Sequence, residues 1–377
     1  MTSRYDAVVI GAGIFGSYAA LAFSRHGARV LLVDSQRHPW TKASVVNQAR
    51  LHQGYHYPRS IATARQAQHY RARFMEDHAD CITGTFRQFY GIDRHGSLTN
   101  ANQFARFCDF LGVSYRESML PETFCRDRLE TVFEVSEPTF DPFLLALSYQ
   151  RALRDSTVET RFGWHVADAG NVGSEWRVTL QDDAGGQNVV GARMVLNATY
   201  ANINSVNRHF GFDPVDATHE VSEIVLVQSR RLKNIGLTVM DGPYPSIMPY
   251  GRTAFHSLTS VPYTHHWLSH DSEPTFPCQA KRSDCRPESL APCTRCPVKP
   301  SSNATKMSRQ LRLYLQDSVD LYIHGSLWTV KTKLASSYID DARPTDVRVL
   351  SEDPVFALIF SGKVTSIYEV EKLTDAI

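Results

Sequence analysis

The sequence predicts an α/β fold with a parallel sheet near its beginning and a separate antiparallel sheet later in the chain. Three observations predict it. Residues 5–10 are largely apolar and lead into the glycine-rich run Gly11-Ala12-Gly13-Ile14-Phe15-Gly16. Residues 28–33 form a second apolar run, which ends in Asp34. Residues 221–260 hold short β-branched or aromatic runs bounded by Gly and Pro, which is typical of antiparallel strands.

The first of these units has the form strand, glycine-rich turn, helix, strand. Gly11 permits the tight turn, Gly13 lets a pyrophosphate approach the backbone, and Gly16 lets the helix pack against the strand. The N–H groups at the start of the helix then face the phosphates. Asp34 lies 18 residues after Gly16, where an acid can bind a ribose hydroxyl. The unit therefore predicts a dinucleotide cofactor, with contacts from Gly11, Gly13, Ile14, Phe15, Gly16, Asp34 and Ser35.

Residues 7–23 carry no charge, so a signal segment or a membrane span is the alternative interpretation. The run is short for a span of about 20 residues, and its glycines have the spacing of a phosphate-binding loop. The net charge of +1 argues against nucleic acid or a membrane surface as the main partner. No second long apolar segment follows, so we expect no membrane span and a cytoplasmic protein. A length of 377 residues is enough for two packed domains.

Residues 43–60 are dense in side chains that can donate, accept or titrate. Together with the first unit they resemble the FAD-dependent oxidoreductases of the D-amino-acid oxidase (DAO) type. The stretch from Asn47 to Pro58 is similar to the Asn-Ser-Gly-x-Ile-His-Ala-Gly-x-Tyr-Tyr-Pro pattern of the L-2-hydroxyglutarate dehydrogenase-like branch. The matching residues are Asn47, His52, Gly54, Tyr57 and Pro58, whereas Gln48 and Ala49 depart from the pattern.

The resemblance implies FAD as cofactor. It also implies an FAD-binding Rossmann-like domain of the glutathione-reductase type, interleaved with an antiparallel-sheet α+β substrate domain. In such enzymes the second stretch runs beside the pyrophosphate and the flavin ring. The resemblance therefore implies cofactor contacts from Ser44, Asn47 and Gln48, and a place in the active site for His52.

Between these regions, periodicity predicts one helix over residues 61–79 and another over 102–111. Asp141-Pro142 forms an N-cap followed by proline at the first helical position, and predicts a helix through Leu153. Residues 157–166 read as a strand, and the resemblance implies an adenine contact near its end at Val166. Strands are expected over 176–180 and 189–198. The second leads into Asn197-Ala198-Thr199-Tyr200, which is similar to the Ala-Thr-Gly of many flavoproteins and implies cofactor contacts from Ala198 and Thr199.

The short strands over 221–260 would form the substrate domain laid over the flavin. A polar, cysteine-rich insert near 270–302 follows them, with thiols at Cys278, Cys285, Cys293 and Cys296. These four thiols, the last two of which form a C-x-x-C pair, could complete a structural zinc site. The metal would then stabilise a segment whose apolar content is too low to fold by itself. An iron–sulfur cluster, free thiols and a disulfide remain open alternatives.

Near the end of the chain, Asp340-Asp341-Ala342-Arg343-Pro344 resembles the family's Asp-x-x-Pro turn, and residues 355–360 read as a buried strand. The corner after this strand would point a helix N-terminus at the flavin pyrimidine. The candidate contacts here are Arg343, Gly362, Lys363, Val364 and Thr365. The expected domains are 1–60, 138–215 and 336–377 for FAD, and 61–137 and 216–335 for substrate.

The resemblance implies an FAD-dependent dehydrogenase or oxidase that removes a hydride from a CH–OH or CH–NH carbon of a small polar metabolite to flavin N5. His52 is the first candidate base, with His56 and then His256 behind it. Arg50, Arg252 and Arg343 are candidate forks for a substrate carboxylate. Three alternatives stay open: the same chemistry on a sugar, nucleoside or biosynthetic intermediate, flavin attached covalently through His52 or a cysteine, and a non-catalytic flavin-binding interaction protein. The electron acceptor is not indicated.

Overall fold

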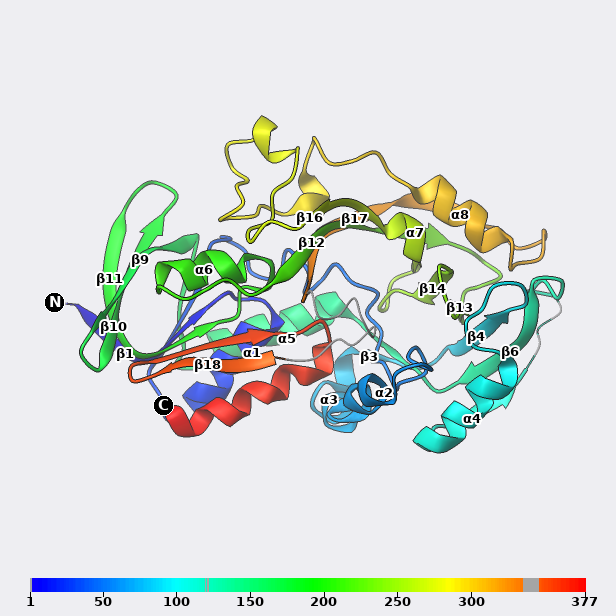
Figure 1. Ribbon diagram of the computed structural model, residues 1–377, viewed down its shortest axis with the longest axis horizontal. Helices are drawn as coiled ribbons and strands as arrows, with labels where there is room; N and C mark the ends of the chain where they lie inside the picture. The colour runs from blue at the N-terminus through cyan, green and yellow to red at the C-terminus, as the bar shows by residue number, and fades with distance from the viewer. Residues whose placement is uncertain (1, 119, 121, 335–345) are drawn as a thin grey trace.

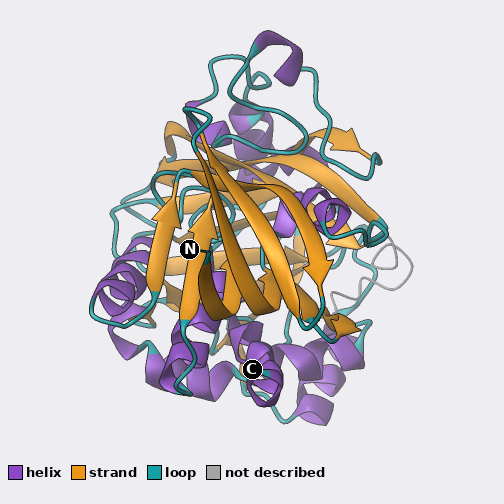
Figure 2. Ribbon diagram, turned by 90° about the vertical axis from the view of Figure 1, so that its left-hand side faces the viewer, coloured by secondary structure: helices purple, strands orange, loops and turns teal. Residues whose placement is uncertain are grey.

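The computed structural model describes residues 2–118, 120, 122–334 and 346–377 (Figure 1). An eight-stranded sheet and a nine-stranded sheet account for nearly all of the strands, and β3 (Ile82–Thr83) pairs with β7 (Thr139–Phe140) in a small ribbon. Figure 2 shows the strands stacked through the middle of the molecule with most helices gathered along its lower side. The predicted fold class, a parallel-sheet α/β part with a second sheet, is confirmed.

The eight-stranded sheet has the order β18-β19-β11-β1-β2-β8, and a hairpin of β9 and β10 extends it through β11. Strand β1 lies at its centre, parallel to both β11 and β2. The turn after β1 therefore opens at the carboxyl edge between two parallel neighbours, where open α/β sheets bind ligands. The strands are β1 (Ser3–Ile10), β2 (Val30–Asp34), β8 (Glu159–Phe162), β9 (Trp164–Val172), β10 (Glu175–Asp182), β11 (Gln187–Asn197), β18 (Asp346–Glu352) and β19 (Val355–Phe360).

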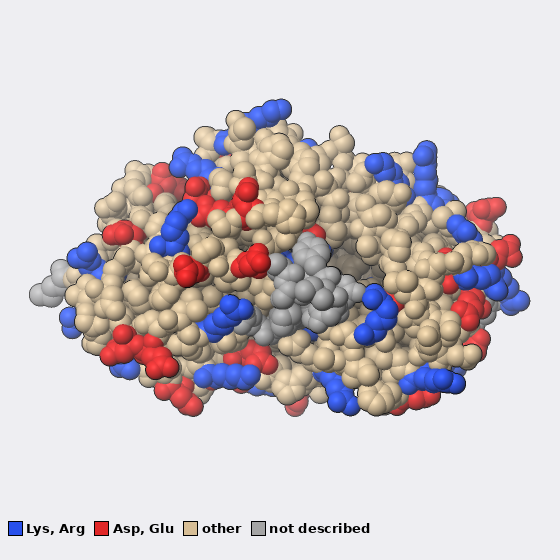
Figure 3. Space-filling view, viewed as in Figure 1, with Lys and Arg blue, Asp and Glu red and all other residues tan. Residues whose placement is uncertain are grey.

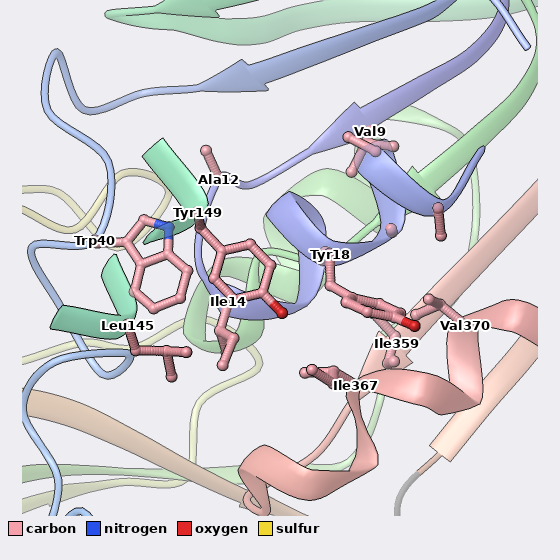
Figure 4. Close-up of a cluster of buried hydrophobic side chains, with 14 of the residues drawn as sticks. Val9, Ala12, Ile14, Tyr18, Trp40, Leu145, Tyr149, Ile359, Ile367 and Val370 are labelled. Carbon is pink, nitrogen blue, oxygen red and sulfur yellow. The ribbon is translucent and has the colours of Figure 1, made fainter. Parts of the chain in front are cut away.

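One face of this sheet is covered by α1 (Ile14–Arg25), α5 (Pro142–Arg154) and the 3₁₀ segment η5 (Val364–Ala376). Their side chains form the largest apolar cluster (Figure 4), in which Trp40 stacks on Tyr149 with ring centroids 5.2 Å apart. The Asp141 carboxylate accepts from the backbone N–H groups of Phe143 and Leu144, at 2.9 and 3.0 Å, and so caps α5 as predicted. Helix α6 (Ile203–His209) packs against β9 and β11.

The second sheet has the order β16-β12-β15-β14-β13-β4-β6-β5, with β17 also paired to β12. Its pairs are antiparallel except β13 and β4, which run parallel. The strands are β4 (Arg87–Asp93), β5 (Tyr115–Glu117), β6 (Leu129–Val135), β12 (Ala217–Gln228), β13 (Ile235–Met240), β14 (Pro245–Pro249), β15 (His256–Ser260), β16 (His265–Ser269) and β17 (Tyr322–Leu334). The remaining helices are α2 (Ile61–Gln68), α3 (Arg71–Asp77), α4 (Ala101–Leu111), α7 (Val261–Thr264) and α8 (Ala304–Arg312), and the short 3₁₀ turns are η1 (Ala79–Cys81), η2 (Tyr200–Asn202), η3 (Gln279–Lys281) and η4 (Cys293–Arg295).

Two predicted elements are wrong in detail. The single helix over 61–79 is divided into α2 and α3, because Tyr70 leaves the helical conformation (φ −108°, ψ 10°), and its ring packs against Tyr368. The single strand over 157–166 is divided into β8 and β9 at Gly163 (φ +80°), whose N–H donates to the carbonyls of Asp34 and Gln36. In both places a tertiary contact overrides the local pattern.

The two sheets take their strands alternately along the chain. Strands before Asp34 and from Glu159 to Asn197 belong to the first sheet, whereas β4 to β6 and β12 to β17 belong to the second. The domain limits given above remain predictions. None of the described helices is long and apolar enough to cross a membrane. On the face in Figure 3, acidic and basic side chains are interspersed.

Candidate cofactor and active site

A cavity of about 620 Å³ opens at the carboxyl edge of β1 and extends to the second sheet. The glycine-rich turn forms one end of it. Gly11 has φ +100°, and a Cβ there would lie 2.7 Å from the Ala198 carbonyl oxygen. A Cβ on Gly16 would lie 1.8 Å from the Gly11 oxygen, so Gly16 serves the packing of α1 on β1 rather than the cavity wall. Gly13, Ile14 and Phe15 line the cavity directly.

The polar wall at this end is built by the end of β2 and the residues after it. The Asp34 carboxylate accepts from the backbone N–H groups of Ala12 (2.6 Å) and Gln36 (2.7 Å). The Ser44 hydroxyl accepts from the N–H of Ile14 at 3.0 Å. Val166, Ser35 after Asp34, and Ala198 and Thr199 after β11 also line the cavity.

The two places where the chain departs from a family glycine share one backbone conformation. Ala49 has φ +55° and Tyr200 has φ +57°, which is the left-handed region that glycine occupies most readily. The Ala49 N–H donates to the Asn47 side-chain oxygen at 2.7 Å, and the Tyr200 hydroxyl donates to the Thr332 carbonyl at 3.0 Å. Each turn is thus kept without its glycine: a local hydrogen bond accompanies the less favourable conformation at Ala49, and a contact with β17 accompanies it at Tyr200.

The corner after β19 contributes Gly362, Lys363, Val364 and Thr365 to the lining. Lys363 is 5% exposed, and its ammonium donates to the Gln66 side-chain oxygen at 3.1 Å and lies 5.6 Å from the Tyr57 ring centroid. The His52 ring lies 5.5 Å from the same Tyr57 ring. The corner and the segment around His52 therefore meet across Tyr57.

A buried polar network connects this segment to the second sheet. Arg50 donates to Tyr90 (3.1 Å), Thr238 (2.7 Å) and Ser246 (2.6 Å), and its Nε lies 3.7 Å from the Glu137 carboxylate. The Arg50 guanidinium is therefore held by the protein, although Arg50 lines the cavity, and its role as a fork for a substrate carboxylate stays a prediction. Gln48 and His52 both line the cavity, and the Gln48 amide donates to the Thr259 hydroxyl.

The other predicted catalytic residues lie elsewhere. His56 is exposed and stands outside the described lining of the cavity, with its ring 5.8 Å from that of His52. His256 is buried, and its Nε2 pairs with the Leu232 carbonyl at 2.8 Å, so β15 turns it away from the cavity. Arg252 follows Tyr250 outside the same lining. Arg343 lies outside the described residues.

The predicted zinc site is not supported. Within the part of the chain that the structure describes, no group of three or more His, Cys, Asp or Glu side chains is placed to hold a metal ion. The Cys285 sulfur accepts from the Ala291 N–H at 3.5 Å. Cys285 packs in an apolar cluster with Phe276, Leu290 and Trp328, and Cys278 and Cys293 pack against that cluster. Cys296 is buried as well. The insert thus buries apolar side chains of its own, which the prediction of a metal staple did not anticipate.

Instead, the insert covers one end of the cavity (yellow loops at the top of Figure 1). Leu290, Ala291 and Cys293 line the cavity, and the Leu290 carbonyl accepts from the Gln36 side chain at 3.4 Å. Lys42 lies here too: burial lowers the pKa of its ammonium, while the Asp34 carboxylate acts in the opposite direction. Sequence reasoning missed Lys42 and the position of the insert at the cavity, because nothing in either polar segment signals that it lines a pocket.

Glu137 is the most important residue that sequence reasoning missed. It follows β6 and is fully buried at its side chain, within reach of both Arg50 and His52. Glutamate side chains are rarely buried, and nothing in the sequence before Pro138 signals an exception, so only the fold reveals it.

The residues present fit a dinucleotide of the FAD class. The cavity volume lies within the usual range for ligand pockets, about 300 to 1,000 Å³. Its glycine-rich end opens at the N-terminus of the 12-residue helix α1, which favours phosphate. Asp34 keeps acceptor capacity beyond its two backbone contacts, because a carboxylate has about four lone-pair sites.

Comparison with known proteins gives the same cofactor. The family model described as FAD dependent oxidoreductase (DAO) matches residues 6–271. An FAD-dependent monooxygenase of Fusarium mangiferae, FPY4, is 23% identical over 363 residues, which cover 96% of this chain and 87% of the relative.

Solved structures share the fold across the whole chain. L-α-glycerophosphate oxidase from Mycoplasma pneumoniae matches with a TM-score of 0.72 at 13% identity, covering 99% of this chain and 94% of that one. NikD, an amino acid oxidase of nikkomycin biosynthesis, has a TM-score of 0.70 at 16% identity and covers 100% and 94%. L-proline dehydrogenase from P. horikoshii has a TM-score of 0.69 at 11% identity and covers 99% and 92%.

Proposed function

Because the chain belongs to the DAO family of FAD-dependent oxidoreductases, we propose that it removes a hydride from a CH–NH or CH–OH carbon of a small polar metabolite. The chain is an FAD-dependent enzyme; the substrate class and the hydride step are the proposal. The names of its structural neighbours support it, since an amino acid oxidase, a proline dehydrogenase and a glycerophosphate oxidase all act on small polar molecules that carry an amine or an alcohol. The assignment to the L-2-hydroxyglutarate dehydrogenase-like branch stays a prediction.

We assign the cofactor contacts from the lining of the cavity. The turn and helix N-terminus would hold the pyrophosphate, Asp34 and Ser35 the ribose, and Val166 the adenine. Ala198 and Thr199 would close the pyrophosphate side, and the corner after β19 would carry the flavin pyrimidine. The residues assigned to FAD are Gly11, Gly13, Ile14, Phe15, Asp34, Ser35, Ser44, Asn47, Gln48, Val166, Ala198, Thr199, Gly362, Lys363, Val364 and Thr365.

The observation that carries the proposal is the position of His52. Its ring lines the cavity, and its Nδ1 lies 3.7 Å from the Glu137 carboxylate. FAD supplies a hydride acceptor when it is bound. His52 would take the proton from the hydroxyl or ammonium group of the substrate, so that the C–H electron pair leaves with the hydride and a C=O or C=N bond forms.

An anaerobic spectral titration tests the proposal. The FAD-loaded protein is mixed, without oxygen, with amino acids, hydroxy acids and sugars in turn, and the flavin absorbance is followed. We expect bleaching with members of one amine or alcohol class. If dithionite bleaches the flavin but no compound of the panel does so, the proposed substrate class is wrong. Readmission of air then shows whether oxygen accepts the electrons, which the name of the Fusarium relative makes worth measuring.

A further inference from the structure

Glu137 is a buried carboxylate in the loop between β6 and β7, and no cofactor motif calls for an acid there. Its side chain is 0% exposed. A carboxylate taken out of water is strongly disfavoured unless it is paired and hydrogen-bonded. The surroundings of Glu137 therefore indicate what keeps it in place.

Its two oxygens face different partners. Oε2 accepts from the Tyr90 hydroxyl at 2.7 Å and lies 3.7 Å from Arg50 Nε. Oε1 accepts from the Gln53 backbone N–H at 3.1 Å and lies 3.7 Å from His52 Nδ1. Although burial alone would raise the pKa of Glu137, contacts with His52, Arg50 and Tyr90 outweigh it and lower the pKa to about 2. Glu137 is therefore an anion at neutral pH.

The other groups of the network are fixed by the second sheet. Arg50 also donates to Thr238 and Ser246, and its Nε–H donates to the Met248 sulfur at 2.8 Å, while its charge balances that of Glu137. Arg50 and His52 both line the cavity, but the Arg50 guanidinium is held by the sheet and has no acceptor nitrogen, so His52 is the partner of Glu137 that can act as a base there. The 3.7 Å separation is longer than an ordinary hydrogen bond and leaves room for tightening when substrate binds.

We propose that Glu137 is a positioning residue for His52: its carboxylate accepts a hydrogen bond from Nδ1–H and thereby leaves Nε2 unprotonated and turned away from Glu137, as the base of the reaction. This inference rests on the proposed function. A carboxylate in this position selects one tautomer of the neutral imidazole and favours its protonated form after proton transfer. Glu137 itself keeps its charge and does not touch the substrate.

The test is a ring-nitrogen NMR titration of the FAD-loaded protein labelled with ¹⁵N-histidine. The chain has 15 histidines, and loss of one signal set in His52→Gln assigns His52. In the wild type we expect the Nδ1–H tautomer. In Glu137→Gln the amide donates to Nδ1, the proton moves to Nε2, and the His52 pKa falls by about 1 unit or more because an anion has been lost.

Kinetics on the same variants separate positioning from structure. We expect Glu137→Gln to slow flavin reduction by about 100- to 10,000-fold, with Glu137→Asp in between because it keeps the charge. Glu134→Gln is the matched control, since its carboxylate lies three residues away and pairs with Arg87 and Arg116 instead. It should leave both the tautomer and the rate unchanged.

A wild-type His52 that carries its proton on Nε2 would overturn the inference without any variant. The inference can therefore be tested even if Glu137→Gln fails to fold. An unchanged His52 tautomer and pKa in a folded Glu137→Gln would also overturn it. Because the NMR measurement needs no substrate, it still decides the role of Glu137 if no compound reduces the flavin and the proposed function fails.

Discussion

The Asp34 carboxylate accepts a hydrogen bond from the Ala12 backbone N–H at 2.6 Å, which ties the end of β2 to the glycine-rich turn after β1. One acid thus holds the turn in shape and presents its remaining lone pairs to the cavity. The contact explains why the glycine-rich turn is followed by an acid at a fixed distance, with Asp34 18 residues after Gly16.

We predict that Asp34→Ala weakens FAD binding by about 10- to 100-fold, because it removes the ribose acceptor and leaves the Ala12 N–H unpaired, at about 1 to 3 kcal/mol. Fluorescence titration of the apoprotein with FAD measures this. Asp6→Ala is the control, since Asp6 accepts from the Arg29 N–H at 2.8 Å in an exposed position between the same two strands. Equal FAD affinity in both variants would contradict the assignment of Asp34.

Gly13→Ala should separate cofactor binding from folding. A Cβ at Gly13 would lie 2.9 Å from the Ser44 hydroxyl, which can rotate away at the loss of one hydrogen bond of about 1 kcal/mol. The same methyl group would occupy the space assigned to the pyrophosphate. We expect a melting temperature within a few degrees of the wild type in the apoprotein, but FAD affinity reduced more than about 10-fold. Gly170→Ala, where the new Cβ meets nothing within 4 Å, is the control. Normal FAD affinity in Gly13→Ala would place the pyrophosphate elsewhere.

The sequence predicted the first unit well because its signals are local: a glycine with φ +100°, a helix directly after it and an acid at a fixed distance. The breaks at Tyr70 and Gly163 could not be predicted, since each depends on a partner far along the chain. The role of Glu137 was hidden for the same reason, because burial of a charge is a property of the assembled network. Zinc at the cysteines is not supported, and spacing alone could not decide between a metal site and the free thiols that stayed open, which here include Cys285 packed with Phe276 and Trp328.

The left-handed backbone at Ala49 predicts a stabilising substitution. Replacing Ala49 by glycine removes a steric strain of about 1 to 2 kcal/mol from the folded state. It also makes the unfolded chain more flexible, which lowers stability by about 0.5 to 1 kcal/mol. We expect Ala49→Gly to raise the free energy of unfolding by up to about 1 kcal/mol in urea titration. Ala152→Gly, in an exposed position of α5, should lower it by about 1 kcal/mol. A loss of stability in Ala49→Gly would show that the methyl group contributes more through packing than it costs in strain.

Glu220 predicts how stability changes with pH. Its carboxylate lies 3.0 Å from His265 Nδ1 and 2.9 Å from Lys333 Nζ. Burial opposes ionisation of Glu220, but these contacts lower its pKa from 4.5 to about 2. Since the folded pKa is depressed, the stabilisation is present above the unfolded pKa and is lost as the pH falls from 4.5 towards 2.

We therefore expect Glu220→Gln to be less stable than the wild type by about 2 kcal/mol at pH 7, with a smaller difference at pH 3.5. Chemical denaturation at both pH values measures it. Glu175→Gln, which breaks the exposed pair with Arg4 at 3.4 Å, should change stability by less than about 1 kcal/mol at either pH. A difference for Glu220→Gln that does not shrink in acid would mean that the carboxylate charge is not what stabilises the fold.

The most direct test of the central claim is the rate at which the best substrate of the panel reduces bound flavin in His52→Gln, measured anaerobically across pH. We expect a loss of about 100- to 10,000-fold with FAD still bound, and loss of the wild-type rise in rate with pH. The exposed His95→Gln should keep the wild-type rate. Wild-type reduction by His52→Gln, with an unchanged pH profile, would contradict the assignment of His52 as the base.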